Sequence, residues 1–152
     1  MLPLRFYLSK LVFLLYVLYI YLFAKTRDEF YLRYMLIGLI LTPLVSEVKN
    51  ALPKVFPEFT VLRRPEGATY CGMTDSKEKA GIGGMPSVHM FITSFLVYGL
   101  LIGKSVHVSL KCVALICWIV IAYSRIGCHT GTQIATGTFV GLAVGHSMMK
   151  YL

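Results

Sequence analysis

The chain carries at residues 85–103 the stretch MPSVHMFITSFLVYGLLIG, in which a polar start leads into a long apolar run. A helix needs about 20 residues to cross the hydrocarbon core of a bilayer, and this run approaches that length. Four other stretches share its character, and together they predict an all-α fold, a polytopic membrane helical bundle of about five transmembrane helices. The predicted spans are residues 6–24, 30–48, 86–103, 106–124 and 131–150.

Composition places the chain in the same class. Hydrophobic residues make up 57% and charged residues 14% of its 152 residues, and the mean hydropathy is +0.69. A chain this apolar has too much apolar surface for a water-soluble domain of its size. The predicted spans use most of the chain, so we expect one integral-membrane domain over residues 1–152 and a multi-pass location.

The distribution of charge indicates which partners the chain binds, and the positions of the cysteines indicate their roles. The formal net charge is +8, but the basic residues are spread over helix ends and one long loop instead of one soluble face. This distribution favours phosphate groups or anionic lipid headgroups over nucleic acid. Cys112 and Cys117 lie inside a predicted span, where packing explains them. Cys71 and Cys128 fall on one predicted side and are able to form a disulfide if that side is oxidising.

One long loop, at about residues 49–85, interrupts the apolar pattern and is rich in proline, glycine and charged side chains. Loops of this length in compact proteins are usually functional. Its basic residues are Lys49, Lys54, Arg63, Arg64, Lys77 and Lys79. Taken alone, they fit a solvated loop or a positive-inside topology signal. Beside the two motifs described next, they supply positive charge for binding a phosphoryl group.

The helix predicted from Pro86 begins with Ser-Val-His at residues 87–89. A helix N-terminus presents backbone N–H groups and the positive end of its dipole, and the glycines before Pro86 let an anion approach the backbone. Ser87 adds a hydroxyl donor, and His89 in the first turn is placed to exchange a proton with a bound anion. The alternative is a histidine that only forms a hydrogen bond at the membrane interface.

A second motif runs from Ser124 to Gln133 and contains Arg125 and His129. If this segment is helical, the four-residue steps between Arg125, His129 and Gln133 place the three side chains on one face. Arginine grips a phosphate with two parallel hydrogen bonds, and a neutral histidine beside it can attack phosphorus. The Gln133 amide is able to orient the imidazole by accepting from its other ring nitrogen. Arg125 taken alone fits an interfacial anchor equally well.

Helix order predicts that these pieces meet. The loops after the second and fourth spans lie on the same face, because each span crosses the bundle once. We therefore expect the long loop, the helix start at Pro86 and the Arg125 turn at one end of the bundle. On the last span, Gly137, Gly141 and Gly145 repeat every four residues and predict close helix packing.

Together these motifs resemble the type-2 phosphatidic acid phosphatase superfamily over roughly residues 43–146. The signatures of that superfamily are a lysine preceding Arg-Pro, a Pro-Ser-Gly-His helix start, and Ser-Arg followed by His and then Asp. Residues 84–89 and 123–133 look most similar to the dolichyl-diphosphate phosphatase branch, which also tolerates Gln in place of that Asp. The resemblance implies the superfamily's helical core and a location in the endoplasmic reticulum or another endomembrane.

The resemblance also implies residue roles and a reaction. His129 is expected to be the nucleophile that forms a phosphohistidine, with Gln133 orienting it and His89 as the general acid. The expected phosphate-binding residues are Lys49 or Lys54, Arg64, Ser87, Val88 through its backbone N–H, and Arg125. No metal or cofactor is implied. The expected substrate is a polyprenyl diphosphate or a related lipid phosphate, and the oligomeric state is left open.

The chain departs from the superfamily pattern in its spacing. Pro57 stands where the superfamily has its lysine, so Lys49 or Lys54 must substitute, and we favour Lys49 because it ends the predicted helix. Val88 replaces a small residue and narrows the approach to the helix start. Only three residues separate Arg125 from the following histidine, where five are usual.

Gln133 is the most consequential departure. A carboxylate would both orient His129 and stabilise its positively charged phosphorylated form, whereas an amide can do only the first. In a serine-protease triad the comparable change costs about 10⁴ in rate. This motivates an alternative, a catalytically weak or inactive relative that binds phospholipid headgroups or scaffolds a membrane complex. A transporter or channel is disfavoured because the spans lack ionisable residues at their midplane.

Overall fold

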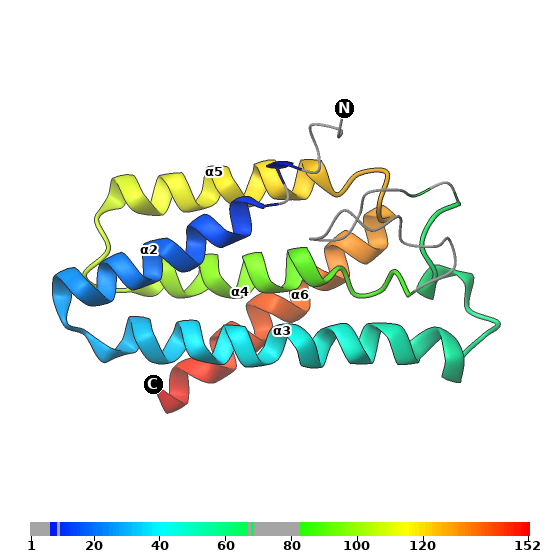
Figure 1. The fold of residues 1–152 in the computed structure, drawn as a ribbon, viewed down its shortest axis with the longest axis horizontal. Coiled ribbons are helices and arrows are strands. Elements are labelled where there is room, and N and C mark those ends of the chain that lie inside the picture. The colour runs from blue at the N-terminus through cyan, green and yellow to red at the C-terminus, as the bar shows by residue number, and fades with distance from the viewer. Residues whose placement is uncertain (1–6, 9, 67, 69–82) are drawn as a thin grey trace.

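The computed structural model describes residues 7–8, 10–66, 68 and 83–152, and every regular element in that part of the chain is a helix (Figure 1). The prediction of an all-α fold is therefore confirmed. Within the described residues, the α-helices are α2 (Leu11–Thr26), α3 (Glu29–Val55), α4 (Val88–Ile102), α5 (Val108–Ser124) and α6 (Gly131–Met148). Two short 3-10 helices, η1 (Thr60–Leu62) and η2 (Met149–Tyr151), complete the list.

Helix α4 lies at the centre of the bundle and contacts α2, α3, α5 and α6 (Figure 1). Its apolar run has no polar face, and a helix of that kind is buried all round. Its buried apolar side chains include Met90, Phe91, Ile92, Phe95, Leu96 and Leu100. The stretch that opened the sequence therefore forms the core around which the other helices pack.

Glycines on α6 let that helix pack tightly on α4. A Cβ on Gly137 would meet the Ser87 carbonyl oxygen at 2.5 Å, and one on Gly141 would collide with the carbonyl of Phe91. Gly145 likewise packs against Tyr34 and Tyr98. The glycine repeat thus acts as predicted, and it sets the beginning of α6 directly against the beginning of α4.

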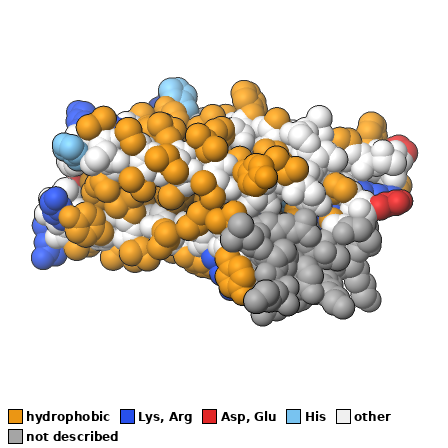
Figure 2. Space-filling view, turned by 90° about the horizontal axis from the view of Figure 1, so that it is seen from above, with side chains coloured by type: hydrophobic (Ala, Val, Ile, Leu, Met, Phe, Trp, Pro, Cys, Tyr) orange, Lys and Arg blue, Asp and Glu red, His pale blue; other side chains and the backbone are white. Residues whose placement is uncertain are grey.

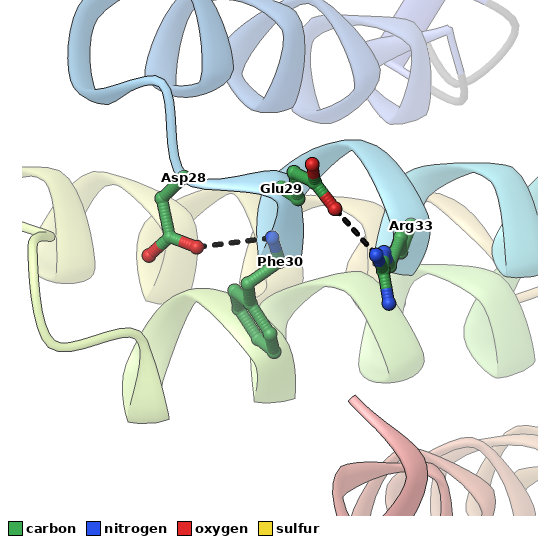
Figure 3. Close-up of polar contacts among 4 residues, drawn as sticks. All are labelled: Asp28, Glu29, Phe30 and Arg33. Atoms are coloured by element: carbon green, nitrogen blue, oxygen red, sulfur yellow. Dashed lines mark hydrogen bonds and ion pairs between the residues drawn. The ribbon is translucent and has the colours of Figure 1, made fainter.

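A capped turn joins α2 to α3. Arg27 ends α2 in the left-handed region, with φ 59°, and its N–H donates to the Phe23 carbonyl. Asp28 then caps α3, because its side chain accepts from the Phe30 N–H at 3.0 Å (Figure 3). Glu29 and Arg33 form an ion pair one turn into the helix (Figure 3).

Helix α3 is longer than the sequence indicated. The predicted span ended at residue 48 and the loop began at residue 49, but the helix continues to Val55 through Pro43 and Pro53. A proline inside a helix removes one backbone hydrogen bond, but the helix continues where the following residues still form theirs. Here the Phe56 N–H donates to the Leu52 carbonyl. Lys49 and Lys54 therefore both lie on α3, not in the loop.

The two histidines outside the predicted site have structural partners. His107 caps α5, and its Nδ1 accepts from the Ser109 N–H at 3.4 Å. His146 Nδ1 lies 2.8 Å from the Tyr98 hydroxyl and so links α6 to α4.

The outside of the bundle is strongly apolar. Among the helices that the structure describes, α3 is long and apolar enough to cross a membrane, while α2, α4 and α5 are apolar but shorter. Large hydrophobic side chains are exposed on α2, α3, α5 and α6. Figure 2 shows them covering the flank of the molecule, with Lys, Arg and His side chains gathered at its left end. The number of membrane spans stays a prediction.

Candidate active site

Buried polar side chains gather at one end of the bundle, where α3 and α5 end and α4 and α6 begin, on the right in Figure 1. Each is at most 7% exposed although it is polar or charged. They are Lys49, Arg64, Ser87, His89, Ser124, Arg125, His129 and Gln133. Lys54, the other lysine candidate, is exposed on the last turn of α3. The structure therefore favours Lys49 as the lysine of the site.

A tight turn, not one continuous helix, brings Arg125 and His129 together. Arg125 caps the end of α5, and its carbonyl accepts from the N–H groups of Cys128 and His129, both at 3.0 Å. Gly127 makes the turn with φ 87°, a conformation that glycine adopts without strain. The single helical face predicted for Arg125, His129 and Gln133 is wrong, because α6 begins only at Gly131.

The contacts of His129 determine which ring nitrogen carries the proton. Nδ1 lies 2.9 Å from the Gly84 carbonyl oxygen and 3.2 Å from Gln133 Oε1. Both partners accept hydrogen bonds, so the proton of a neutral ring sits on Nδ1. Nε2 then keeps its lone pair, which is the form a histidine nucleophile needs.

The surroundings of His129 also hold the ring neutral. Burial, followed by the positive charges of Arg64, Lys49 and Arg125, lowers the pKa of His129 to about 3, against a weaker raising effect of the Gln133 hydrogen bond. Cations near the ring disfavour a second positive charge there. The same cations attract an anion, so the site combines an unprotonated imidazole with affinity for negative charge.

The beginning of α4 adds donors to this site. Ser87 is the N-cap of α4 but its side chain makes no capping hydrogen bond, and Ser87 Oγ and His89 Nε2 are buried without a hydrogen-bond partner. Buried polar atoms are normally paired, so these two are suited to a bound ligand. The Val88 N–H belongs to the first turn, whose N–H groups have no partner within the helix.

Gln133 does more than the sequence indicated. Its Oε1 accepts from the Thr130 N–H at 3.1 Å, while its Nε2 donates to the carbonyls of Val61 at 2.7 Å and Arg63 at 2.6 Å. We call this set of three hydrogen bonds the amide bridge. It joins the start of α6 to the segment that carries Arg64.

Sequence reasoning missed Gly84, whose carbonyl is the closer of the two acceptors for His129. Its N–H also donates to the Leu62 carbonyl at 2.7 Å. The glycine pair before Met85 is the signal in the sequence that could have pointed to this contact. Glycine is required because a Cβ on Gly84 would meet Gln133 Nε2 at 2.5 Å and the Arg63 carbonyl oxygen at 2.8 Å.

Gly84→Ala is therefore expected to destabilise the protein by about 1 to 3 kcal/mol, the usual cost of overpacking a filled interior. Gly131→Ala is the matched control, because a Cβ there would meet nothing within 4 Å. Thermal unfolding in detergent micelles measures both variants. Equal midpoints for the two alanine variants would show that the contacts around Gly84 are not tight.

Cys128 also lies at the site end of the bundle, in the turn between Arg125 and His129. It is buried and disulfide-bonded, and Arg125 Nη2 lies 3.8 Å from its sulfur. Cys71, its predicted partner, lies outside the described residues, as do Lys77 and Lys79. Cys112 and Cys117 are free thiols. Across the part of the chain that is described, no group of three His, Cys, Asp or Glu side chains is placed to hold a metal ion.

Comparison with protein-family models, curated proteins and solved structures finds no match for this chain. The geometry of the site and the motifs that build it are therefore the support for a function.

Proposed function

We propose that the protein is an integral-membrane lipid phosphatase that hydrolyses a polyprenyl diphosphate of the dolichyl type, or a related lipid phosphate, through a phosphohistidine on His129. The observation that carries the proposal is the state of His129. The ring is neutral, its Nδ1–H is held by two acceptors, and Lys49, Arg64 and Arg125 lie near enough to act on it electrostatically. A neutral nucleophile close to three cationic side chains suits an anionic phosphorus centre.

The apolar exterior supports a multi-pass membrane location. Exposed large hydrophobic side chains on four helices, such as Ile40 on α3, Ile116 on α5 and Phe139 on α6, suit contact with lipid better than contact with water. Helices satisfy their own backbone hydrogen bonds and so can cross a bilayer. The tail of a lipid substrate would stay in the bilayer against the outer surface of the helices, while its headgroup enters the site at the end of the bundle.

The proposed reaction has two steps. Arg64, Arg125, Lys49, Ser87 Oγ and the N–H of residue 88 hold the phosphoryl oxygens. His129 Nε2 then bonds to phosphorus as the bond to the leaving oxygen breaks, and His89 donates a proton to that oxygen. The negative charge of the bound phosphoryl group favours the protonated imidazole of His89.

In the second step, His89 accepts a proton from water, and the resulting hydroxide bonds to phosphorus as the bond to His129 Nε2 breaks. Inorganic phosphate leaves, and both rings return to their starting states. The proton taken from water replaces the one that His89 gave to the leaving oxygen, so the cycle balances. Each step relies on the two imidazoles reaching the same phosphorus centre.

Purified protein in detergent micelles tests the proposal when it is offered dolichyl or undecaprenyl diphosphate with EDTA present. We expect release of inorganic phosphate that persists in EDTA. The absence of release by the wild-type protein would contradict the assignment. If the lipid phosphate binds in a manner that depends on Arg64 and Arg125 but does not turn over in hours, the chain is the headgroup-binding relative instead.

The low pKa of His129 predicts how its protonation depends on pH. Since the pKa in the folded protein is about 3, the neutral, nucleophilic ring persists from neutral pH downward and is lost only as the pH falls through about 3. An unperturbed histidine would instead become protonated near pH 6.5. NMR titration of isotope-labelled histidine, assigned with His129→Ala, measures the midpoint.

Lys49→Gln supplies the matching comparison for this titration. Removing one of the cations that disfavour protonation should move the midpoint to higher pH without abolishing the depression caused by burial. A wild-type midpoint near pH 6.5, or one that Lys49→Gln leaves in place, would contradict the electrostatic description of the site.

A further inference from the structure

The Gln133 side chain is fully buried and uses all of its hydrogen-bonding groups. The Thr130 N–H can only donate, and the carbonyls of Val61 and Arg63 can only accept. The oxygen and nitrogen ends of the amide therefore cannot be exchanged without losing every bond of the amide bridge. The position needs two donors and an acceptor, which an amide provides and a carboxylate does not.

Backbone contacts extend the amide bridge into the site. The Gly84 N–H donates to Leu62, and its carbonyl accepts from His129 Nδ1 at 2.9 Å. The Ser87 N–H donates to the backbone carbonyl of Gln133 at 3.2 Å. The Arg64 segment, the approach to α4 and the start of α6 are thus joined through one buried residue.

We propose that Gln133 is a positioning residue that fixes Arg64 relative to His129, and that the Gly84 carbonyl, not the side chain at position 133, is the main acceptor that sets the His129 tautomer. The proposal rests on the proposed phosphatase function. Its consequence is that a carboxylate at position 133 impairs this protein, although the resembling superfamily carries a carboxylate there.

The physical reason is repulsion at the loop. In Gln133→Glu an acceptor oxygen would face the carbonyl oxygens of Val61 and Arg63 at the 2.6 to 2.7 Å spacing of the present donor, with no hydrogen between them. The segment would move away and take Arg64 with it. The new charge would also compete with the phosphoryl group for the cations of the site.

Gln133→Glu is therefore expected to lower kcat/KM for lipid diphosphate by about 10²-fold, the scale of a misplacement near 1 Å. Gln133→Asn keeps both donors on a shorter side chain and should recover part of this loss. A kcat/KM for Gln133→Glu equal to or above the wild-type value would overturn the proposal, because the side chain would then act mainly as a substitute carboxylate.

The pH profile separates positioning from a general loss of structure. A carboxylate beside the imidazole raises the pKa of His129, so the acid-side fall of kcat/KM should move to higher pH in Gln133→Glu. A variant that is merely less folded would lose amplitude without that shift. An unshifted profile would therefore count against the placement of position 133 beside His129.

Thr130→Ala is the matched control. Thr130 Oγ1 accepts from the Gln133 N–H at 3.3 Å and caps α6, but it takes no part in the contacts with the loop. This variant should weaken the helix start and keep most of the activity. If Thr130→Ala loses as much activity as Gln133→Glu, the helix cap and not the amide bridge positions the site.

Amide hydrogen exchange tests the amide bridge independently of activity. We expect faster exchange over residues 59–64 in Gln133→Glu than in the wild type or in Thr130→Ala. Unchanged exchange would overturn the proposal whether or not the protein hydrolyses lipid phosphates. If the wild type releases no phosphate but exchange rises as expected, the proposed function fails and the amide bridge stands as a structural element.

Discussion

His129→Ala is expected to abolish phosphate release from a lipid diphosphate. Its Nε2 is the atom that would bond to phosphorus, and removing a nucleophile costs on the order of 10⁶ in kcat where this has been measured in a serine protease. Small-to-moderate losses would point to a supporting role. The measurement is inorganic phosphate released in micelles, followed over hours so that slow turnover is detected.

A phosphoenzyme assay gives this prediction a second readout. A phosphohistidine survives alkaline quenching and is lost in acid, so label from a terminally labelled diphosphate should remain on the wild-type protein after alkali and be absent from His129→Ala. His146→Ala is the control. His146 is an exposed histidine on α6 that forms a hydrogen bond with Tyr98 on α4, and it is not among the buried residues of the site. Label on the His129 variant would contradict the assignment.

His89→Ala is expected to lower the rate by about 10² to 10⁴, the usual contribution of a general acid or base. The loss should depend on the leaving group. A lipid monophosphate releases a strongly basic alkoxide that needs a proton, whereas an aryl phosphate releases a stable phenolate that does not. We therefore expect the first step to survive in His89→Ala with an aryl phosphate.

The second step should still fail in that variant, because no base remains to activate water. A burst of phenolate equal to the enzyme present, followed by slow turnover and an accumulated phosphohistidine, is the expected record in a stopped-flow experiment. Equal losses with both substrates and no burst would mean that His89 supports the helix start and takes no part in proton transfer. The His129→Ala variant should show no burst with either substrate.

Much of the site could be predicted from local motifs. Ser87 and His89 stand at a helix start, and Arg125 and His129 at a helix connection, because each position follows from where an apolar run begins or ends. Helix order then placed them at one end. We could predict that these residues lie close together, because every second connection in a bundle of antiparallel helices lies at the same end.

Other features depended on contacts between distant segments. Lys49 and Lys54 were equivalent candidates in the sequence, and their burial separates them: one is 7% exposed, and the other lies on the outer side of the same helix. The segment before Arg64 is held beside His129 by the hydrogen bonds of Gln133 across 70 residues or more. No local pattern encodes such a contact.

By itself the sequence determined an all-helical protein with an apolar exterior and the candidate residues of the proposed site, because hydrophobic runs and helix termini are local properties of the chain. The tertiary structure alone decided which acceptors hold His129, which lysine is buried and why an amide occupies position 133. Those outcomes depend on backbone carbonyls, which every residue possesses and which acquire a role only when folding brings a donor to them.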